Sequence, residues 1–244
     1  DCGIKAIEQA KYAQAAGIDL IICDHHLPGP ELPEAFAILD PKRPDCAYPF
    51  KELSGCGVGF KLLQGFCIQN TIDLSLLFKY LDLLVISIGC DIVPIQGENR
   101  VLAFYGLKKI NSSPLPSVKS LMEVSALKGQ VKISDLVFYL GPRINAAGRL
   151  AHAKRAVELL IGNDEELVNT VAKELNTINT ERREADLSTT EAALEMIFEN
   201  PDYEKLSSTV VFHDSWHKGI VGIVASRCIE QHYRPTIVLT ASNG

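Results

Sequence analysis

The sequence predicts an α/β protein in which a parallel sheet is joined by a long helix to a second, smaller α/β domain. Three observations favour this class. The apolar run 20–23 ends abruptly in Asp24-His25-His26, as a buried parallel strand does when it delivers polar side chains at its carboxyl end. A helical pattern precedes this run, which makes a β-α-β unit if Asp1 ends an earlier strand. The stretch 164–198 has hardly any helix-breaking residue, which predicts a helix on the order of 50 Å long.

The N-terminal region begins with a helix and a strand. Apolar residues at helical spacing predict a helix over 4–16 with Gly17 as its C-terminal cap, and the strand 18–23 follows. If Asp1 ends an earlier strand, the crossover helix places the two strands parallel and adjacent, so that Asp1 and His25 lie side by side. The sequence therefore predicts that the side chain of Asp1 joins those of Asp24 and His25 at the same edge of the sheet.

A proline-rich loop follows this strand. The loop, 27–50, surrounds a short strand near 37–39 and carries the basic pair Lys42-Arg43. After it, the glycine-rich turn 54–59 opens an apolar helix. Its glycines either present backbone N–H groups to a phosphate or allow close packing, and the sequence leaves both interpretations open.

Helical spacing continues through the middle of the chain. The run 81–88 predicts a helix, although 83–88 alone also fits a strand. It is followed by Asp91 between apolar neighbours, which is either a buried cap or a ligand because an unpaired buried charge costs too much free energy. Another helix is expected over 100–111, and a loop rich in Pro and Ser over 112–117.

The segment 141–149 combines Arg143, Asn145 and Arg149 with small residues, before the chain turns helical toward 156–160. Small residues let a backbone approach a ligand closely, and guanidinium groups bind phosphates or carboxylates through forked donors. The same arginines would equally serve to cap helices or to pair with acidic loops. The sequence gives these two interpretations the same weight.

The long helix carries an apolar stripe in its first half, which gives way to the polar run 180–184. A helix that is polar all round connects domains more often than it forms a core element, so a second domain is expected to begin near residue 200. The residues that follow are too few to close an α/β domain, and the chain is expected to stop inside it.

In this second domain the runs 209–212 and 236–239 predict strands. Between them, Gly219 and Gly222 allow close approach at a helix N-terminus, where backbone donors and the helix dipole favour an anion. The cationic candidates nearby are His217, Lys218 and Arg227. Packing of the helix on a strand explains the glycines but not the cations.

The composition is that of a globular protein, with 47% hydrophobic and 22% charged residues. No long apolar run occurs, so no membrane partner is expected. The seven cysteines are odd in number and lack a C-x-x-C pair, which predicts reduced thiols and a cytoplasmic protein. The net charge of −6 gives no general attraction to nucleic acid, so such binding requires local basic clusters. Because the sequence begins at Asp1 without an initiator Met, a piece of a longer protein is expected.

Asp24, His25 and His26 together supply oxygen and nitrogen donors, a mixture that suits manganese, zinc or iron better than calcium. Polar residues also gather at strand ends simply because turns begin there, and short motifs often match by chance. A metal site is therefore the first hypothesis, and an ordinary turn is its alternative.

Several segments, taken in chain order, resemble one known family. They are 1–4, 24–28, 40–43, 48–50, 53–55, 91–94, 141–149 and 219–227. In this order they closely resemble the RecJ family of single-strand-specific DNA exonucleases, within the DHH phosphoesterase superfamily. The similarity runs over essentially the whole chain, and such ordered agreement is more specific than any one motif.

The resemblance implies three segments: a DHH phosphoesterase domain over 1–163, truncated at its N-terminus, a connector helix over 164–199 and a partial DHHA1-like substrate-binding domain over 200–244. It also implies 5′-to-3′ degradation of single-stranded DNA to mononucleotides in repair and recombination. Two Mn²⁺ or Mg²⁺ ions would activate a water and stabilise the leaving oxygen. The implied partners are single-stranded DNA, a single-strand-binding protein and a helicase.

The resemblance further implies roles for individual residues. Asp1 looks like the aspartate that bridges two metals, and His25 and Asp91 look like further metal ligands. Asp24 looks like the group that orients His25, and His26 is similar to the histidine that contacts the scissile phosphate. The residues implied to line the DNA path are Arg143, Asn145, Arg149, His217, Ser226 and Arg227.

The sequence departs from the family pattern at its ends. An Asp-rich strand end upstream of Asp1, a Gly-Gly-His segment and a further nucleic-acid-binding domain are not in the sequence, so this piece is expected to be at best weakly active. Two rival classes remain open. One is a DHH phosphoesterase acting on short oligonucleotides, cyclic dinucleotides or polyphosphate, and the other is a non-catalytic scaffold that binds single strands or proteins. Intact Asp1, His25, His26 and Asp91 argue against the scaffold.

Overall fold

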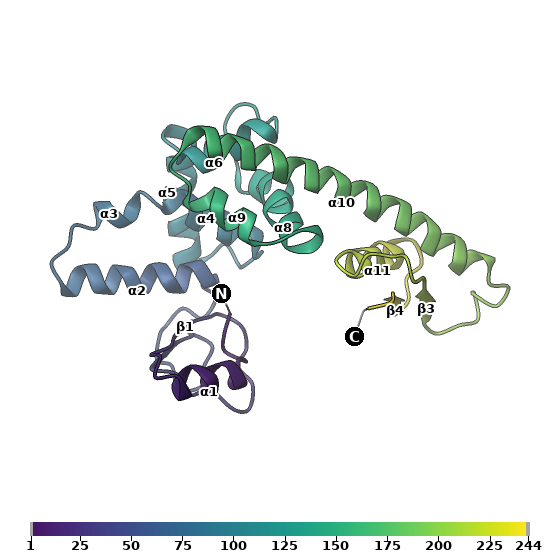
Figure 1. Cartoon of the computed structure of the whole chain (residues 1–244), viewed down its shortest axis with the longest axis horizontal. Helices are drawn as coiled ribbons and strands as arrows, with labels where there is room; N and C mark the ends of the chain where they lie inside the picture. Colours follow the sequence, from purple (N-terminus) through teal and green to yellow (C-terminus); the bar gives the residue numbers. More distant parts are fainter. Residues whose placement is uncertain (1, 243–244) are drawn as a thin grey trace. The chain divides into compact units, whose positions relative to one another are not determined.

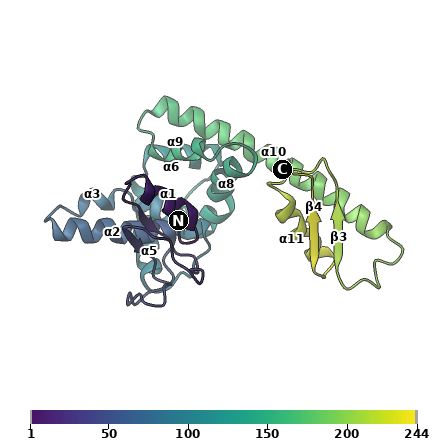
Figure 2. The same ribbon diagram turned by 60° about the horizontal axis from the view of Figure 1, so that its bottom comes forward.

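A computed structural model describes residues 2–242 of the chain. It confirms the predicted α/β class, with two small parallel sheets in a predominantly helical chain (Figures 1 and 2). The chain falls into two compact units. The first unit takes the residues up to 141 together with 162–168, and the second takes 142–161 together with the residues from 169 on.

The first unit begins with helix α1 (Ile7–Ala15) and strands β1 (Ile21–Cys23) and β2 (Ala37–Leu39). The two strands are parallel and in register from their first residues to their last. The N–H of Asp24 extends the ladder by donating to the carbonyl of Leu39 at 3.0 Å. A parallel sheet is therefore confirmed, and it places Asp24 at the carboxyl end of the pair. The pairing predicted for a strand ending at Asp1 lies outside the described residues.

The helix and the first strand are both shorter than their sequence patterns predicted. α1 does not include Ile4, because this residue is buried and its N–H donates to the side chain of Asp24. β1 begins only at Ile21, where its pairing with β2 starts. Gly17 follows α1 with a φ of +69°, the left-handed conformation that glycine adopts without strain, which confirms the predicted cap.

Helices make up the rest of the first unit. They are α2 (Gly55–Gln69), α3 (Ser75–Phe78), α4 (Leu81–Cys90), α5 (Gly97–Ser112), α6 (Pro116–Val124), α7 (Ile133–Asp135) and the π-helix η1 (Leu136–Leu140). α4 packs against α2, α5 and η1 and buries Leu84, Val85 and Ile88 completely. The predicted helix is therefore confirmed and the alternative strand is wrong. The predicted loop between α5 and α6 is shorter than expected, because Pro116 starts the next helix.

The second unit combines helices with a parallel pair of strands. Its elements are α8 (Gly141–Leu150, in this unit from Pro142), α9 (Lys154–Ile161), most of α10 (Glu165–Glu199), β3 (Thr209–Phe212), α11 (Val221–Gln231) and β4 (Thr236–Leu239). Both predicted strands are confirmed, and α11 is the crossover between them. The core of this sheet consists of Ala193, Leu194, Ile197, Val211, Trp216, Val224, Cys228 and Val238. The segment expected to precede a helix, 141–149, is itself the helix α8.

The predicted long helix is confirmed as α10, which has 35 residues. The polar run 180–184 is exposed or half-buried, but the polar residues on either side of it, Asn179 and Asp186, are buried. From Asn169 on, α10 belongs to the second unit. The division into a phosphoesterase domain over 1–163, a connector over 164–199 and a substrate-binding domain over 200–244 stays a prediction.

Two further observations concern the chain as a whole. Among residues 2–242, none of the helices combines the length and the apolar character needed to cross a membrane. The seven cysteines are all free thiols.

Candidate metal and phosphate site

Asp24 is the centre of a hydrogen-bond network at the carboxyl end of β1. One carboxylate oxygen accepts the N–H of Ile4 at 2.9 Å, and the other accepts the N–H groups of His25 at 2.7 Å and His26 at 3.2 Å. The Nδ1 of His26 lies 2.7 Å from the same oxygen. Burial raises the pKa of Asp24, but these hydrogen bonds outweigh burial and hold its pKa well below the ordinary value. Asp24 is therefore an ionised acceptor that organises the turn.

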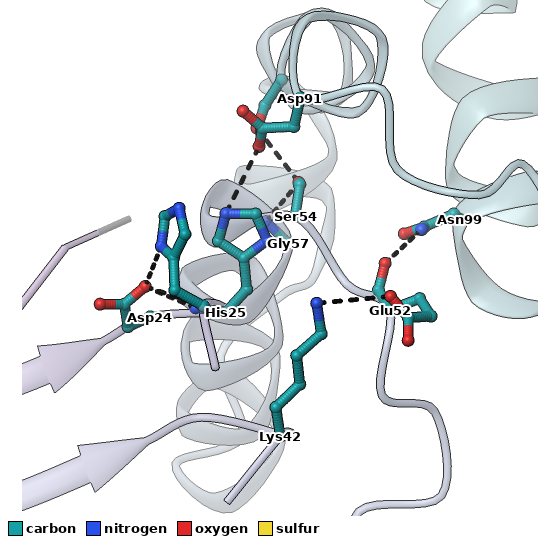
Figure 3. Close-up of polar contacts among 10 residues, drawn as sticks. Asp24, His25, Lys42, Glu52, Ser54, Gly57, Asp91 and Asn99 are labelled. Carbon is teal, nitrogen blue, oxygen red and sulfur yellow. Dashed lines mark hydrogen bonds and ion pairs between the residues drawn. The ribbon is translucent and has the colours of Figure 1, made fainter. Parts of the chain in front are cut away.

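The network orients the ring of His26. Because Nδ1 faces an ionised carboxylate, the hydrogen bond assigns a hydrogen to Nδ1 and leaves Nε2 for other contacts. The side chain of His26 is 58% exposed. The resemblance implied that Asp24 orients the ring of His25. The structure corrects this expectation, since the ring that Asp24 holds is that of His26. Asp24 contacts His25 at its main-chain N–H (Figure 3).

His25 faces Asp91, which comes from the end of α4. The Nε2 of His25 lies 4.0 Å from the Oδ2 of Asp91, too far for a hydrogen bond (Figure 3). Burial lowers the pKa of His25, and the charge of Asp91 opposes this effect. The neutral imidazole is thereby favoured, and the neutral imidazole is the form that binds a metal.

Asp91 is the C-cap of α4, and its side chain is 25% exposed. Of the two alternatives that the sequence left open, the cap is therefore present but is not buried. The hydroxyl of Ser87 lies 3.3 Å from the Oδ2 of Asp91 and 3.1 Å from the hydroxyl of Ser54, which caps α2. The next residue, Ile92, has a φ of +53°, a strained conformation for a β-branched side chain. A short polar network and a strained turn therefore hold Asp91 beside His25. Its role as a ligand stays a prediction.

Lys42 is a component of the site to which the sequence analysis assigned no role. Its Nζ lies 3.4 Å from the Oε2 of Glu52, and its charge adds to the lowering of the pKa of His25 (Figure 3). Its main-chain N–H donates to the side chain of Asp40 at 2.8 Å. Asp40 is buried and directly follows β2, just as Asp24 directly follows β1. The position of Lys42 just after the predicted strand 37–39 was the sequence feature that could have indicated its place near the site.

An opening of about 440 Å³ lies beside this network. Asp24 and His26 line it together with Gln9 and the segment 2–6. Its volume is in the range of ligand-binding sites. The oriented ring of His26 is thus next to a space that admits a phosphate group.

The described donors fit a divalent metal in kind. An imidazole nitrogen and a carboxylate oxygen face each other, a combination that manganese accepts. Asp1, the third expected ligand, lies outside the described residues. Among residues 2–242, no group of three or more histidine, cysteine, aspartate or glutamate side chains is arranged to hold a metal ion. His25 and Asp91, as predicted ligands, would therefore supply only part of a metal site.

The glycines predicted to form a turn over 54–59 lie in the first turns of α2 and have a packing role. Gly55 and Gly57 are buried, and the N–H of Gly57 donates to the hydroxyl of Ser54 at 3.1 Å. A Cβ added to Gly57 would lie 3.3 Å from that hydroxyl oxygen. Of the two interpretations left open by the sequence, these contacts favour close packing over phosphate binding.

The residues predicted to line the DNA path all lie in the second unit. They are Arg143, Asn145 and Arg149 on α8, His217 before α11, and Ser226 and Arg227 on α11. The Nη1 of Arg149 donates to the carbonyl of Gly219 at 3.2 Å, and a Cβ on Gly219 would overlap the main chain of Arg149. The Nδ1 of His217 accepts the N–H of Gly219 at 3.0 Å. Gly219 thus serves close packing, whereas Gly222 faces open space.

Two of the arginines are held by side chains of α10 that the sequence analysis missed. The Nε of Arg143 donates to the Oδ1 of Asn176 at 2.9 Å, and the Nη2 of Arg227 lies 2.8 Å from the Oδ2 of Asp186. Ser226 donates to the carbonyl four residues earlier at 3.1 Å. The functions of all six residues in DNA binding stay predictions. No sequence pattern pointed to Asp186, because its partner is far away in the chain.

Together, the parallel strand pair followed by Asp-His-His and the helix-ending aspartate that faces it define an α/β protein of the DHH type. The comparisons with known proteins agree. Residues 1–88 match the family model described as "DHH family, N-terminal domain".

The chain is also similar to named exonucleases. It is 40% identical, over 98% of its length, to "Single-stranded-DNA-specific exonuclease RecJ" of Bacillus subtilis (strain 168). It matches "Crystal structure of exonuclease RecJ bound to manganese" with a TM-score of 0.85 and 28% identity, over 98% of this chain and 59% of that chain. It also matches the crystal structure of RecJ in complex with Mg²⁺ from Thermus thermophilus, with a TM-score of 0.76 and 28% identity, over 92% of this chain and 33% of that chain.

Residues 1–88 therefore match the DHH family, and the chain is homologous to RecJ exonucleases over almost its whole length. It spans 30% of the length of the Bacillus subtilis relative.

Proposed function

We propose that this chain is the metal-binding and strand-binding part of a single-stranded-DNA-specific exonuclease, which hydrolyses phosphodiester bonds from the 5′ end and releases mononucleotides. The observation that carries the proposal is the 40% identity with a curated RecJ over 98% of the chain. The pair His25 and Asp91 beside the oriented ring of His26 supports it with chemistry. Manganese or magnesium is the proposed cofactor, since RecJ structures are described with each.

In this proposal His25, Asp91 and Asp1 would hold the divalent metal. When bound, a pair of such ions would activate a water and stabilise the leaving oxygen. The scissile phosphate lies in the opening of about 440 Å³, where His26 binds it. The ionised carboxylate of Asp24 holds the ring of His26 through its Nδ1, so that the ring is already oriented when it meets a phosphate oxygen. Asp24 thus acts on the substrate through His26.

The second unit binds the strand in this proposal. Its candidates are Arg143, Asn145, Arg149, His217, Ser226 and Arg227. Arginines grip the phosphate backbone without reading bases, which suits an enzyme that degrades DNA of any sequence. A single-strand-binding protein and a helicase are the proposed partners, because both act where single strands are exposed. The cytoplasm is the proposed location.

The test is calorimetric titration with Mn²⁺ of the whole chain and of its His25→Ala variant. We expect the wild-type chain to bind Mn²⁺ and the variant to lose the binding heat, because the imidazole is a direct ligand. His152→Ala is the matched control, since His152 is an exposed histidine outside the site, and it should bind Mn²⁺ as the wild type does. Equal heats for the wild type and His25→Ala would contradict the assignment of the metal site.

A second measurement separates the proposal from a phosphoesterase that acts on small substrates. We expect metal-dependent cleavage of a long single-stranded oligonucleotide to be faster than cleavage of a dinucleotide, because the arginines of the second unit bind a long strand at several phosphates. A preference for the dinucleotide or for a cyclic dinucleotide would favour the rival class.

A further inference from the structure

Helix α10 carries a row of polar side chains along one face in its middle. This α10 polar row consists of Asn176, Asn179, Arg182, Arg183 and Asp186. Asn176, Asn179, Arg183 and Asp186 recur at three- and four-residue spacing, which places them on one face of the helix, and Arg182 lies beside them, three residues after Asn179 and four before Asp186. Apolar side chains continue the same face beyond them, at Ala193 and Ile197. Polar groups in the middle of a partly buried face require partners, because unpaired burial costs free energy.

The two asparagines of the row bind arginines. Asn176 accepts a hydrogen bond from the Nε of Arg143, which comes from α8, at 2.9 Å. Asn179 is buried and accepts one from the Nη2 of Arg182 at 3.0 Å. The row therefore fixes one arginine of another helix and one of its own.

Asp186 binds two arginines at once. It is completely buried, and its Oδ2 lies 2.8 Å from the Nη2 of Arg227 on α11 and 3.7 Å from the Nη1 of Arg182. Neither carboxylate oxygen of Asp186 makes a hydrogen bond within the described residues, so both contacts are ion pairs. The side chain of Arg182 is 13% exposed, and its Nε is buried with no hydrogen-bond partner in the described part of the chain. The side chain of Arg227 is 45% exposed. Asp186 thus anchors an outer guanidinium through a buried contact.

The arginines of three helices lie close enough to influence one another. Burial lowers the pKa of Arg182, and the charges of Arg149, Arg183 and Arg227 lower it further, against the opposing effect of Asp186. Burial also lowers the pKa of Arg143, and the charge of Arg183 adds to this. A folded protein that already holds several arginines close together binds an anion well. The free energy needed to bring the like charges together is spent during folding and not during binding.

We propose that the arginine cluster, defined as Arg143, Arg149, Arg182, Arg183 and Arg227, is one binding site for the phosphodiester backbone of single-stranded DNA, and that Asp186 is the positioning residue that holds it together. The inference rests on the proposed function and adds Arg182, Arg183 and Asp186 to it. Asp186 does not touch DNA. It fixes Arg182 and Arg227, so that their forked donors meet phosphates without first being ordered.

The direction in which one substitution changes the affinity for DNA tests this role of Asp186. Removing a carboxylate from a protein normally strengthens DNA binding, because the protein becomes less negative. For Asp186→Asn we expect the opposite: the affinity for a fluorescent oligo(dT) falls about tenfold, and the slope of log K against log salt becomes smaller by about 1, since an arginine contact is lost. The measurement is fluorescence anisotropy with EDTA present, so that no metal-dependent step contributes.

Glu191→Gln is the matched control, because Glu191 is an exposed carboxylate of α10 and its removal changes the net charge by the same amount. It should bind oligo(dT) as tightly as the wild type or more tightly. The proposal would be overturned if the Asp186→Asn variant kept its helical circular dichroism and bound oligo(dT) as tightly as the Glu191→Gln variant does.

A second measurement uses the unchanged chain, because a substitution at the buried Asp186 also affects folding. Phenylglyoxal modification of arginines, read by mass spectrometry, should be slowed by bound oligo(dT) at Arg183 and Arg227. Arg155 is the internal control, since it pairs with Glu158 and Glu174 outside the cluster. Equal modification of Arg183 and Arg227 with and without DNA would overturn the proposal. Loss of Mn²⁺ binding or of cleavage would instead contradict only the proposed function.

Discussion

At the scale of single residues, Asp24 shows how one buried carboxylate arranges a site that it does not itself present to a ligand. It accepts hydrogen bonds from three main-chain N–H groups and one imidazole. These donors fix the position of Ile4, the turn at His25 and the ring of His26. Because all four donors favour the ionised form, the carboxylate contributes to stability only while it is charged.

The Asp24→Asn variant should be less stable than the wild type at neutral pH by about 2 kcal/mol, because an amide replaces a charged acceptor of several hydrogen bonds. The pKa of Asp24 is lowered in the folded protein. Its contribution is therefore fully present above the unfolded value of about 3.9 and is lost as the pH falls below it. Urea unfolding of both proteins from about pH 3 to about pH 7 measures this difference. A stability difference that grows toward low pH would contradict the assignment.

At the scale of secondary-structure elements, the first unit depends on a close crossing of α4 and α5. Gly106 of α5 lies against α4, where an added Cβ would lie 2.5 Å from the carbonyl oxygen of Leu81 and 2.6 Å from the Cβ of Val85. α4 ends at the candidate ligand Asp91. The position of that carboxylate therefore depends on a helix contact that only glycine permits.

Gly106→Ala should destabilise the protein by about 1–3 kcal/mol, although alanine is the better helix former, because the methyl group overlaps α4. Gly65→Ala is the matched control. Gly65 lies in α2 and an added Cβ there meets nothing within 4 Å, so this variant should gain about 0.5–1 kcal/mol. Thermal unfolding followed by circular dichroism gives both values. Equal changes in the two variants would show that helix propensity, not packing, decides stability at Gly106.

At the scale of the whole molecule, the chain consists of two compact units, and each has buried apolar residues of its own. The candidate metal ligands His25 and Asp91 belong to the first unit. The sole tryptophan, Trp216, belongs to the core of the second unit. Fluorescence of Trp216 therefore reports on the second unit, while circular dichroism reports on the helices of both.

Saturating Mn²⁺ should raise the unfolding midpoint seen by circular dichroism more than the midpoint seen by Trp216 fluorescence. A ligand stabilises only the unit that binds it when the units unfold separately. The two probes are followed in one thermal scan, with and without Mn²⁺, and His25→Ala should abolish the shift. An equal shift in both probes would show that the two units unfold as one.

The local elements of this protein were largely predictable from the sequence. Periodicity predicted α4 and α10, the cap at Gly17 and the strands β1 to β4, because these patterns depend on neighbouring residues. Asp24-His25-His26 was predictable as a polar cluster at the end of a strand for the same reason. The exact ends of α1 and β1 were not, since Ile4 gives its N–H to Asp24 instead of to a helix.

By itself, then, the sequence determined the fold class, the order of elements and the residue types available for metal and phosphate chemistry. Tertiary structure alone decided which side chains meet. It put the ring of His26, not that of His25, on Asp24, left Asp91 partly exposed opposite His25, and buried Asp186 against Arg227 in a helix whose pattern looked solvated. The physical reason is that periodicity and capping arise from near neighbours, whereas these pairings depend on how distant segments pack, and on which buried charges then require a partner.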